Sequence, residues 1–137
     1  MGTPCAPLAG PGKWAMRSAL AIVAGYWVMA AGVLLLYWLV PAGATQGPGT
    51  GFMAGAMVWG FGLAIAAGAV TAWLAGRAPL GHGLALAALV FVMGRATLLT
   101  QASVEPIWFH LGNIDLGMAG SVIGAVLHAR RARAGSD

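Results

Sequence analysis

Long apolar runs, separated by short stretches rich in glycine, proline and polar residues, dominate the hydrophobic pattern of this chain. The runs cover about residues 14–40, 51–76, 80–100 and 107–129. Each has roughly 20 or more residues, enough to cross a hydrocarbon core about 30 Å thick at about 1.5 Å per residue. Because backbone groups in lipid must bond within their own segment, such runs form helices. The period-2 alternation typical of a β-barrel strand is absent from the sequence.

Short connections join these runs, and residues 76–81 leave room only for a tight turn. Pro106 suits the first turn of a fourth helix, where its missing N–H would have no helical partner. Short connections favour antiparallel packing of consecutive helices. We therefore predict an all-α membrane protein, an antiparallel bundle of four transmembrane helices that forms a single domain over residues 1–137.

Composition and charge support a membrane location and indicate an orientation. Hydrophobic residues make up 60% of the 137 residues and charged ones 7%, against about 25% charged in soluble domains. The positive-inside rule predicts that both termini lie in the cytoplasm, in the inner membrane of a bacterium, with Glu105 outside. A nucleic-acid partner is not expected, because the basic residues do not cover one face. They cluster instead beside the runs, at Lys13, Arg17, Arg77, Arg130, Arg131 and Arg133.

The tryptophans fit two membrane boundaries. Trp27 and Trp59 fall at mid-membrane, and we expect them to pack between helices. The others form a belt on each side: Trp38 and Trp108 at the outer boundary, Trp14 and Trp73 at the inner one.

Small residues indicate how the helices pack, because lipid tails are as apolar as leucine and close approach drives association in membranes. In the fourth run they recur at steps of three and four, which places them on one helix face. This face packs either within the bundle or against another subunit. It comprises Asn113, Gly117, Gly120, Ser121, Gly124 and His128.

Arg95 and Asp115 are charged residues inside apolar runs. Arg95 lies roughly 7 Å and Asp115 roughly 12 Å from the same predicted boundary, so an ion pair between the two helices is geometrically plausible. Such a pair would be a structural clamp between the two helices, unless Arg95 instead reaches outward. The functional alternative is a small polar site lined by Thr97, Thr100, Gln101, His110 and Asn113. Asp115 lies about 160° from Gly117 on the helix, so either Asp115 faces the interior or the glycine face meets a partner.

Enzyme motifs and metal-binding clusters are absent from the sequence: it has no paired carboxylates, no Cys/His cluster, no GxSxG and no phosphate loop. The single cysteine, Cys5, forms no internal disulfide. His82, His110 and His128 are the residues that would ligate haem or chlorophyll, but their positions beside the loops do not favour it. We predict no enzyme activity, no catalytic residue, no metal and no cofactor.

Three stretches, RSALAIVAGYWVMA, WLAGRAPLGHGLALAALVFVMG and IWFHLGN, resemble a group of small, uncharacterised bacterial four-helix membrane proteins. The resemblance implies the same fold and brings no function with it. From the residues themselves we expect a non-catalytic accessory subunit of a larger membrane complex, respiratory or photosynthetic, with lipid and other membrane subunits as partners. The alternative is a small transporter or ligand-binding protein that uses the region of Arg95 and Asp115.

Overall fold

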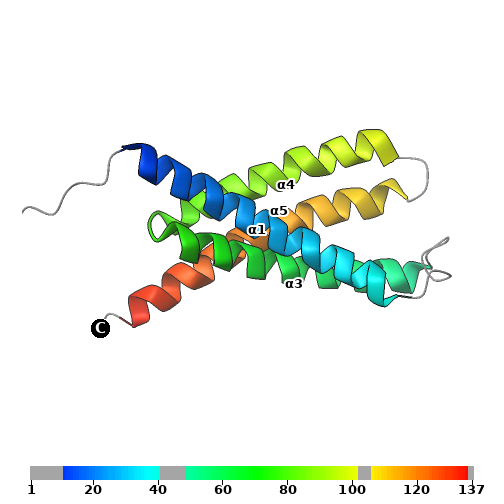
Figure 1. Ribbon diagram of the computed structural model, residues 1–137. Coiled ribbons are helices and arrows are strands. Elements are labelled where there is room, and N and C mark those ends of the chain that lie inside the picture. The colour runs from blue at the N-terminus through cyan, green and yellow to red at the C-terminus, as the bar shows by residue number, and fades with distance from the viewer. Residues whose placement is uncertain (1–10, 41–48, 102–105, 136–137) are drawn as a thin grey trace, which may run out of the picture.

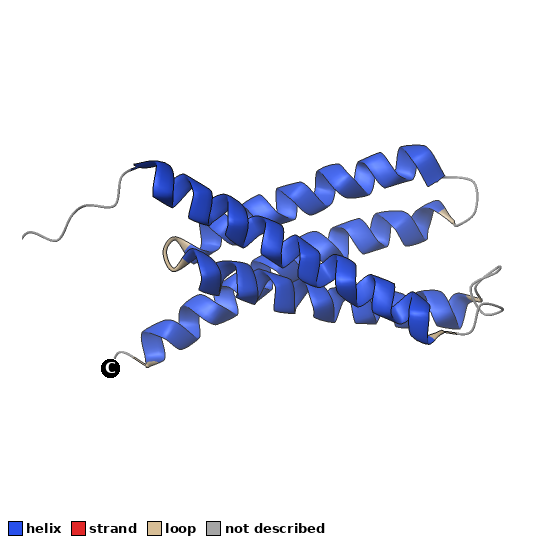
Figure 2. Ribbon diagram, viewed as in Figure 1, coloured by secondary structure: helices blue, strands red, loops and turns tan. Residues whose placement is uncertain are grey.

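The computed structural model describes residues 11–40, 49–101 and 106–135, so Cys5 and Glu105 lie outside the described part. Every regular element within these ranges is a helix (Figure 2). The helices are α1 (Pro11–Leu39), α3 (Thr50–Ala75), α4 (Pro79–Gln101) and α5 (Ile107–Ala134). All four are long and apolar enough to cross a membrane. The prediction of an all-helical protein with four helices of this kind is confirmed.

Two helix ends extend beyond the apolar runs. α1 begins at Pro11 rather than near residue 14, and proline suits the first helical position. α5 continues to Ala134 rather than ending near residue 129, with Arg131 and Arg133 in its last turn. Alanine and arginine are strong helix formers, and positive charge near a helix C-terminus is favourable. Hydropathy alone therefore misplaced both ends.

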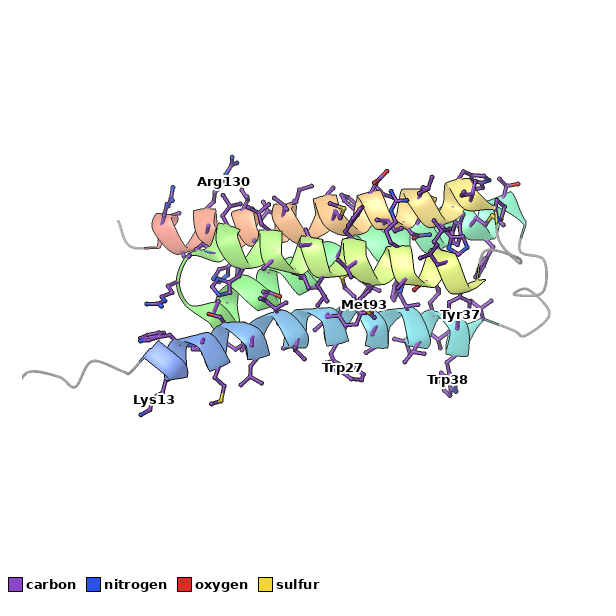
Figure 3. The ribbon with its side chains drawn as sticks, turned by 90° about the horizontal axis from the view of Figure 1, so that it is seen from above. Lys13, Trp27, Tyr37, Trp38, Met93 and Arg130 are labelled. Carbon is purple, nitrogen blue, oxygen red and sulfur yellow. The ribbon has the colours of Figure 1, made fainter. Side chains whose placement is uncertain are left out.

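One end of the molecule gathers the positive charge. The start of α1, the connection from α3 to α4 and the end of α5 lie together there (Figure 1). Figure 3 shows Lys13 and Arg130 at this end and Trp38 at the other. We call it the basic end, because these segments carry six of the seven Lys and Arg residues. Arg95 is the exception.

α3 packs most extensively on α5, although α4 lies between them in sequence. The two helices run in the same direction, since Gly60 faces Asn113 at one level and Ile65 faces Gly124 at another. Small side chains form much of the core, where Ala64, Ala67 and Ala125 are fully buried, as is the larger Leu86. Close helix approach thus replaces the large side chains of a soluble core.

The two tryptophans expected between helices differ in position. The Trp59 indole N–H donates to the Gly32 carbonyl oxygen at 3.1 Å and links α3 to α1. Trp27 is 63% exposed and points away from the other helices (Figure 3), so the prediction that it packs inside is wrong. An apolar side chain has no need to be buried where the surroundings are as apolar as the interior.

Only residues 76–78 connect α3 to α4. Gly76 ends α3 in the left-handed conformation, with φ 72°, and its N–H donates to the Ala72 carbonyl oxygen. Ala78, which precedes α4, also has a positive φ of 46°. The tight turn is therefore made by two left-handed residues, of which only one is glycine.

Candidate functional site

The small-residue face of α5 lies where α5 crosses α3. A Cβ added at Gly124 would overlap the carbonyl oxygen of Ile65, and one added at Gly68 would overlap that of Ser121. The Ser121 hydroxyl is satisfied within α5, donating to the Gly117 carbonyl oxygen at 2.8 Å. The face therefore packs within the chain, backbone against backbone. Gly117, Gly120, Ser121 and Gly124 are buried, whereas Asn113 and His128 are half-buried.

Arg95 and Asp115 emerge side by side from two helices in contact. A Cβ on Gly94 would meet the Ile114 side chain, so these two residues lie at the same level of α4 and α5. Arg95 follows Gly94 and Asp115 follows Ile114, and the two charged residues are therefore at nearly the same level as well. Both charged side chains are exposed. Within the described part of the chain no ion pair joins them, and the Arg95 guanidinium carbon lies 5.2 Å from the centroid of the Phe91 ring.

The orientation of α5 differs from both arrangements considered from the sequence. Asp115 does not face the interior. The glycine face is covered within the chain, by α3 at Gly120 and Gly124 and by α4 and α1 at Gly117. The outer side of α5 therefore carries a carboxylate about 12 Å beyond the start of the helix at Ile107.

A cavity of about 350 Å³ lies among the four helices toward the end opposite the basic end. Side chains from every helix line it, and its apolar wall includes Met29, Leu63 and Phe109. The Asn113 amide N–H donates to the Phe109 carbonyl oxygen at 3.0 Å. The polar and amphipathic groups around the cavity are Tyr37, Trp59, Thr97, His110 and Asn113.

The cavity gathers some of the polar residues grouped from the sequence and leaves others out. Thr97, His110 and Asn113 line it, whereas Arg95 and Asp115 do not. Tyr37 and Trp59 were missed, because aromatic residues near a membrane boundary or at mid-span usually serve as anchors or packing. The side chains of Thr100 and Gln101 lie outside the described part.

Among the described residues, the histidines do not form a metal site with other ligands. Across the described residues, no group of three His, Cys, Asp or Glu side chains is placed to hold a metal ion. His82 Nδ1 lies 3.0 Å from the Ala78 carbonyl oxygen. Since a carbonyl only accepts, this contact requires a proton on Nδ1.

Comparison with known proteins finds no matching family model, no matching curated protein and no matching solved structure. The resemblance to small bacterial four-helix proteins gains no support from these comparisons, so function is argued from the geometry alone.

Proposed function

We propose that the chain spans the inner membrane of a bacterium as an antiparallel four-helix bundle, with the basic end in the cytoplasm. Four apolar helices of sufficient length support this, as does the gathering of Lys and Arg at one end. Large apolar side chains such as Leu34, Val58 and Leu99 are exposed, at 66%, 73% and 86%. Such a surface suits lipid far better than water.

In that setting the exposed charges of α4 and α5 are costly. Insertion scales give about 2.5–3.5 kcal/mol for a charged residue at the centre of a membrane helix. Arg95 lies about 6 Å from the end of its span at Leu99, so its long side chain reaches the boundary. Asp115 is short and lies deeper, and among the described residues it has no cationic partner. A lone chain therefore leaves this carboxylate facing hydrocarbon.

We infer that a second membrane protein covers the outer α4–α5 face, and that the chain is a non-catalytic accessory subunit of a larger complex. The exposed carboxylate of Asp115 is the observation that carries this proposal. The partner supplies a cation or hydrogen-bond donors to Asp115, because buried charges in membranes are paired.

The test is the size of the particle that carries the native chain in mild detergent. The chain alone has a mass of 13.8 kDa, and we expect the wild type in a larger particle that contains another polypeptide. Asp115→Leu should release it as a single chain, because an apolar side chain needs no partner in lipid. Ile123→Leu, on the outer side of α5 at 40% exposure, is the matched control and should keep the particle intact. A wild type that is already a single chain would contradict the proposal.

A double-mutant cycle separates this proposal from an intramolecular clamp. In the isolated chain, the effects of Arg95→Leu and Asp115→Leu on the free energy of unfolding should add within about 0.5 kcal/mol. Neither substitution alone should destabilise the chain, since both side chains are exposed. A coupling well above that value would place the ion pair inside the chain and remove the need for a partner.

The cavity favours a second candidate function, a small transporter or ligand-binding protein. Thr97, His110 and Asn113 converge with two aromatic rings on a space of about 350 Å³, the size and mixed lining of a small-ligand site. A small molecule should then copurify with the wild type and with Asp115→Leu. Asn113→Leu, which removes the amide from the cavity wall, should lose the bound molecule. A wild type that carries no bound molecule would leave this function without support.

A further inference from the structure

A broad groove of about 610 Å³ runs along α1 at the basic end and is closed on one side by Leu74 of α3. Its wall is apolar, formed by residues such as Met16, Leu20 and Ala24, and its upper end carries Lys13 and Arg17. The two cations are four residues apart, so they lie on the same face of α1, about 6 Å apart along its axis.

Arg17 is held in place by α3. Its Nε–H donates to the Leu74 carbonyl oxygen at 2.9 Å, one of the last carbonyls of α3, which have no partner within the helix. A Cβ added at Gly76 would lie 3.0 Å from one terminal guanidinium nitrogen. The guanidinium is thus anchored on one edge, and its orientation is fixed before any ligand arrives.

The positive charge around the groove is not neutralised by the described part of the chain. The guanidinium carbon of Arg77, in the α3–α4 connection, lies 4.2 Å from the centroid of the Trp14 ring. Arg77 thus adds a third cation beside α1. Asp115 is the sole described carboxylate. It lies on the outer α4–α5 face near the start of α5, far from the basic end. The groove therefore presents cations above an apolar channel, the pattern that fits an anionic amphiphile.

We propose that this groove binds an anionic phospholipid of the inner leaflet, with its phosphate between Lys13 and Arg17. An acyl chain lies along Met16, Leu20 and Ala24. The nine residues from Met16 to Ala24 span about 12 Å, close to the thickness of one leaflet, about 15 Å. The proposal rests on the membrane insertion given under the proposed function and goes beyond it, because it names a ligand and a site remote from Asp115.

The experiment measures thermal unfolding of the full chain in mild detergent against added lipid. Phosphatidylglycerol should raise the unfolding temperature in a saturable way, whereas phosphatidylcholine with the same acyl chains should not. Lys13→Gln and Arg17→Gln should each raise the half-saturating lipid concentration about fivefold, the weight of one basic residue at an anionic surface. Arg131→Gln removes the same charge at the basic end but outside this groove. This control should leave the half-saturating lipid concentration unchanged.

Three results would overturn the proposal: equal effects of the two lipids, the same half-saturation in Lys13→Gln and Arg131→Gln, or an equal shift from inorganic phosphate alone. Lys13→Gln keeps the test decisive if Arg17→Gln unfolds through loss of its bond to Leu74. A failure here with an intact large particle would leave the subunit proposal standing. Saturable binding of phosphatidylglycerol by a wild type that is already a single chain would overturn the subunit proposal alone.

Discussion

At the scale of single residues, a glycine, which has no side chain, sets the distance between α3 and α5. Gly124 lies directly against the α3 backbone, at the Ile65 carbonyl oxygen and the Ala69 amide nitrogen. Both obstacles are backbone atoms, so no side chain can turn aside to make room. Gly62 of α3 is the opposite case, because no described atom lies within 4 Å of a Cβ added there.

We predict that Gly124→Ala lowers the free energy of unfolding by more than about 2 kcal/mol, since overpacking commonly costs about 1–3 kcal/mol and here two helices must separate. Gly62→Ala should raise it by about 0.5–1 kcal/mol, the usual gain from replacing a helical glycine. Thermal unfolding of both variants in detergent provides the comparison. A Gly124→Ala variant as stable as the wild type would mean that the helices do not cross at this point.

The residues that the sequence identifies are those whose chemistry stands out against an apolar background. Arg95 and Asp115 are visible as charges, and the small residues of α5 are visible through their spacing. The sequence misplaces Trp27 and does not assign Tyr37 to the cavity, because a helix apolar on all sides has no face marked for burial. Which large side chains face a cavity and which face lipid then depends on packing alone.

At the scale of elements, the connection from α3 to α4 is the most constrained segment of the described chain. Gly76 and Ala78 both have positive φ, and the Arg17 guanidinium lies beside Gly76. For an L-residue, left-handed geometry costs about 1–2 kcal/mol. The turn therefore carries strain at Ala78 that a glycine would not have.

Opposite effects are expected at the two positions. Ala78→Gly should stabilise the chain by up to about 1 kcal/mol, because relief of the left-handed strain exceeds the added freedom of the unfolded state. Gly76→Ala should destabilise it by about 1 kcal/mol or more. Gly81→Ala should not destabilise the chain, because no described atom would meet the new Cβ there. Chemical unfolding of the three variants tests this, and stabilisation by Gly76→Ala would show that the turn is built differently.

The sequence predicts where the helices are better than it predicts which helices pack against each other. Apolar length alone identifies all four helices, because each run is as long as a membrane span requires. The ends at Pro11 and Ala134 lie outside the apolar runs and follow from capping and charge instead. The pairing of α3 with α5 is not implied by short connections, which suggest only that consecutive helices touch. It depends on which small-residue faces fit together, and that is a property of surfaces in three dimensions.

At the scale of the whole molecule, the distribution of charge is the main asymmetry. Lys13, Arg17, Arg77 and the arginines at the end of α5 share one end, and the other end carries Trp38 and Trp108. Basic segments stay in the cytoplasm during insertion. The distribution of charge therefore predicts an orientation for the bundle, whereas its packing follows from small residues.

We predict that the basic end is cytoplasmic. In a Cys5→Ala background, Ile107→Cys and Ala134→Cys place a thiol at the two ends of α5, both at exposed positions. A thiol reagent that cannot cross the membrane should label Ile107→Cys in intact cells and Ala134→Cys only after permeabilisation. Denatured samples of both should label equally, as the control for reactivity. Labelling of Ala134→Cys alone in intact cells would reverse the orientation.

The pairing of α3 with α5 has a consequence for how the protein is made. Synthesis runs from the N-terminus, so α3 is made before α4 and well before α5. The surface around Ala64 and Gly68 must remain without its final neighbour until the last helix has left the ribosome. In the proposed membrane setting, a nascent chain that ends after α4 leaves this surface of α3 uncovered. The helix that packs most extensively on α3 is therefore the last one to be made.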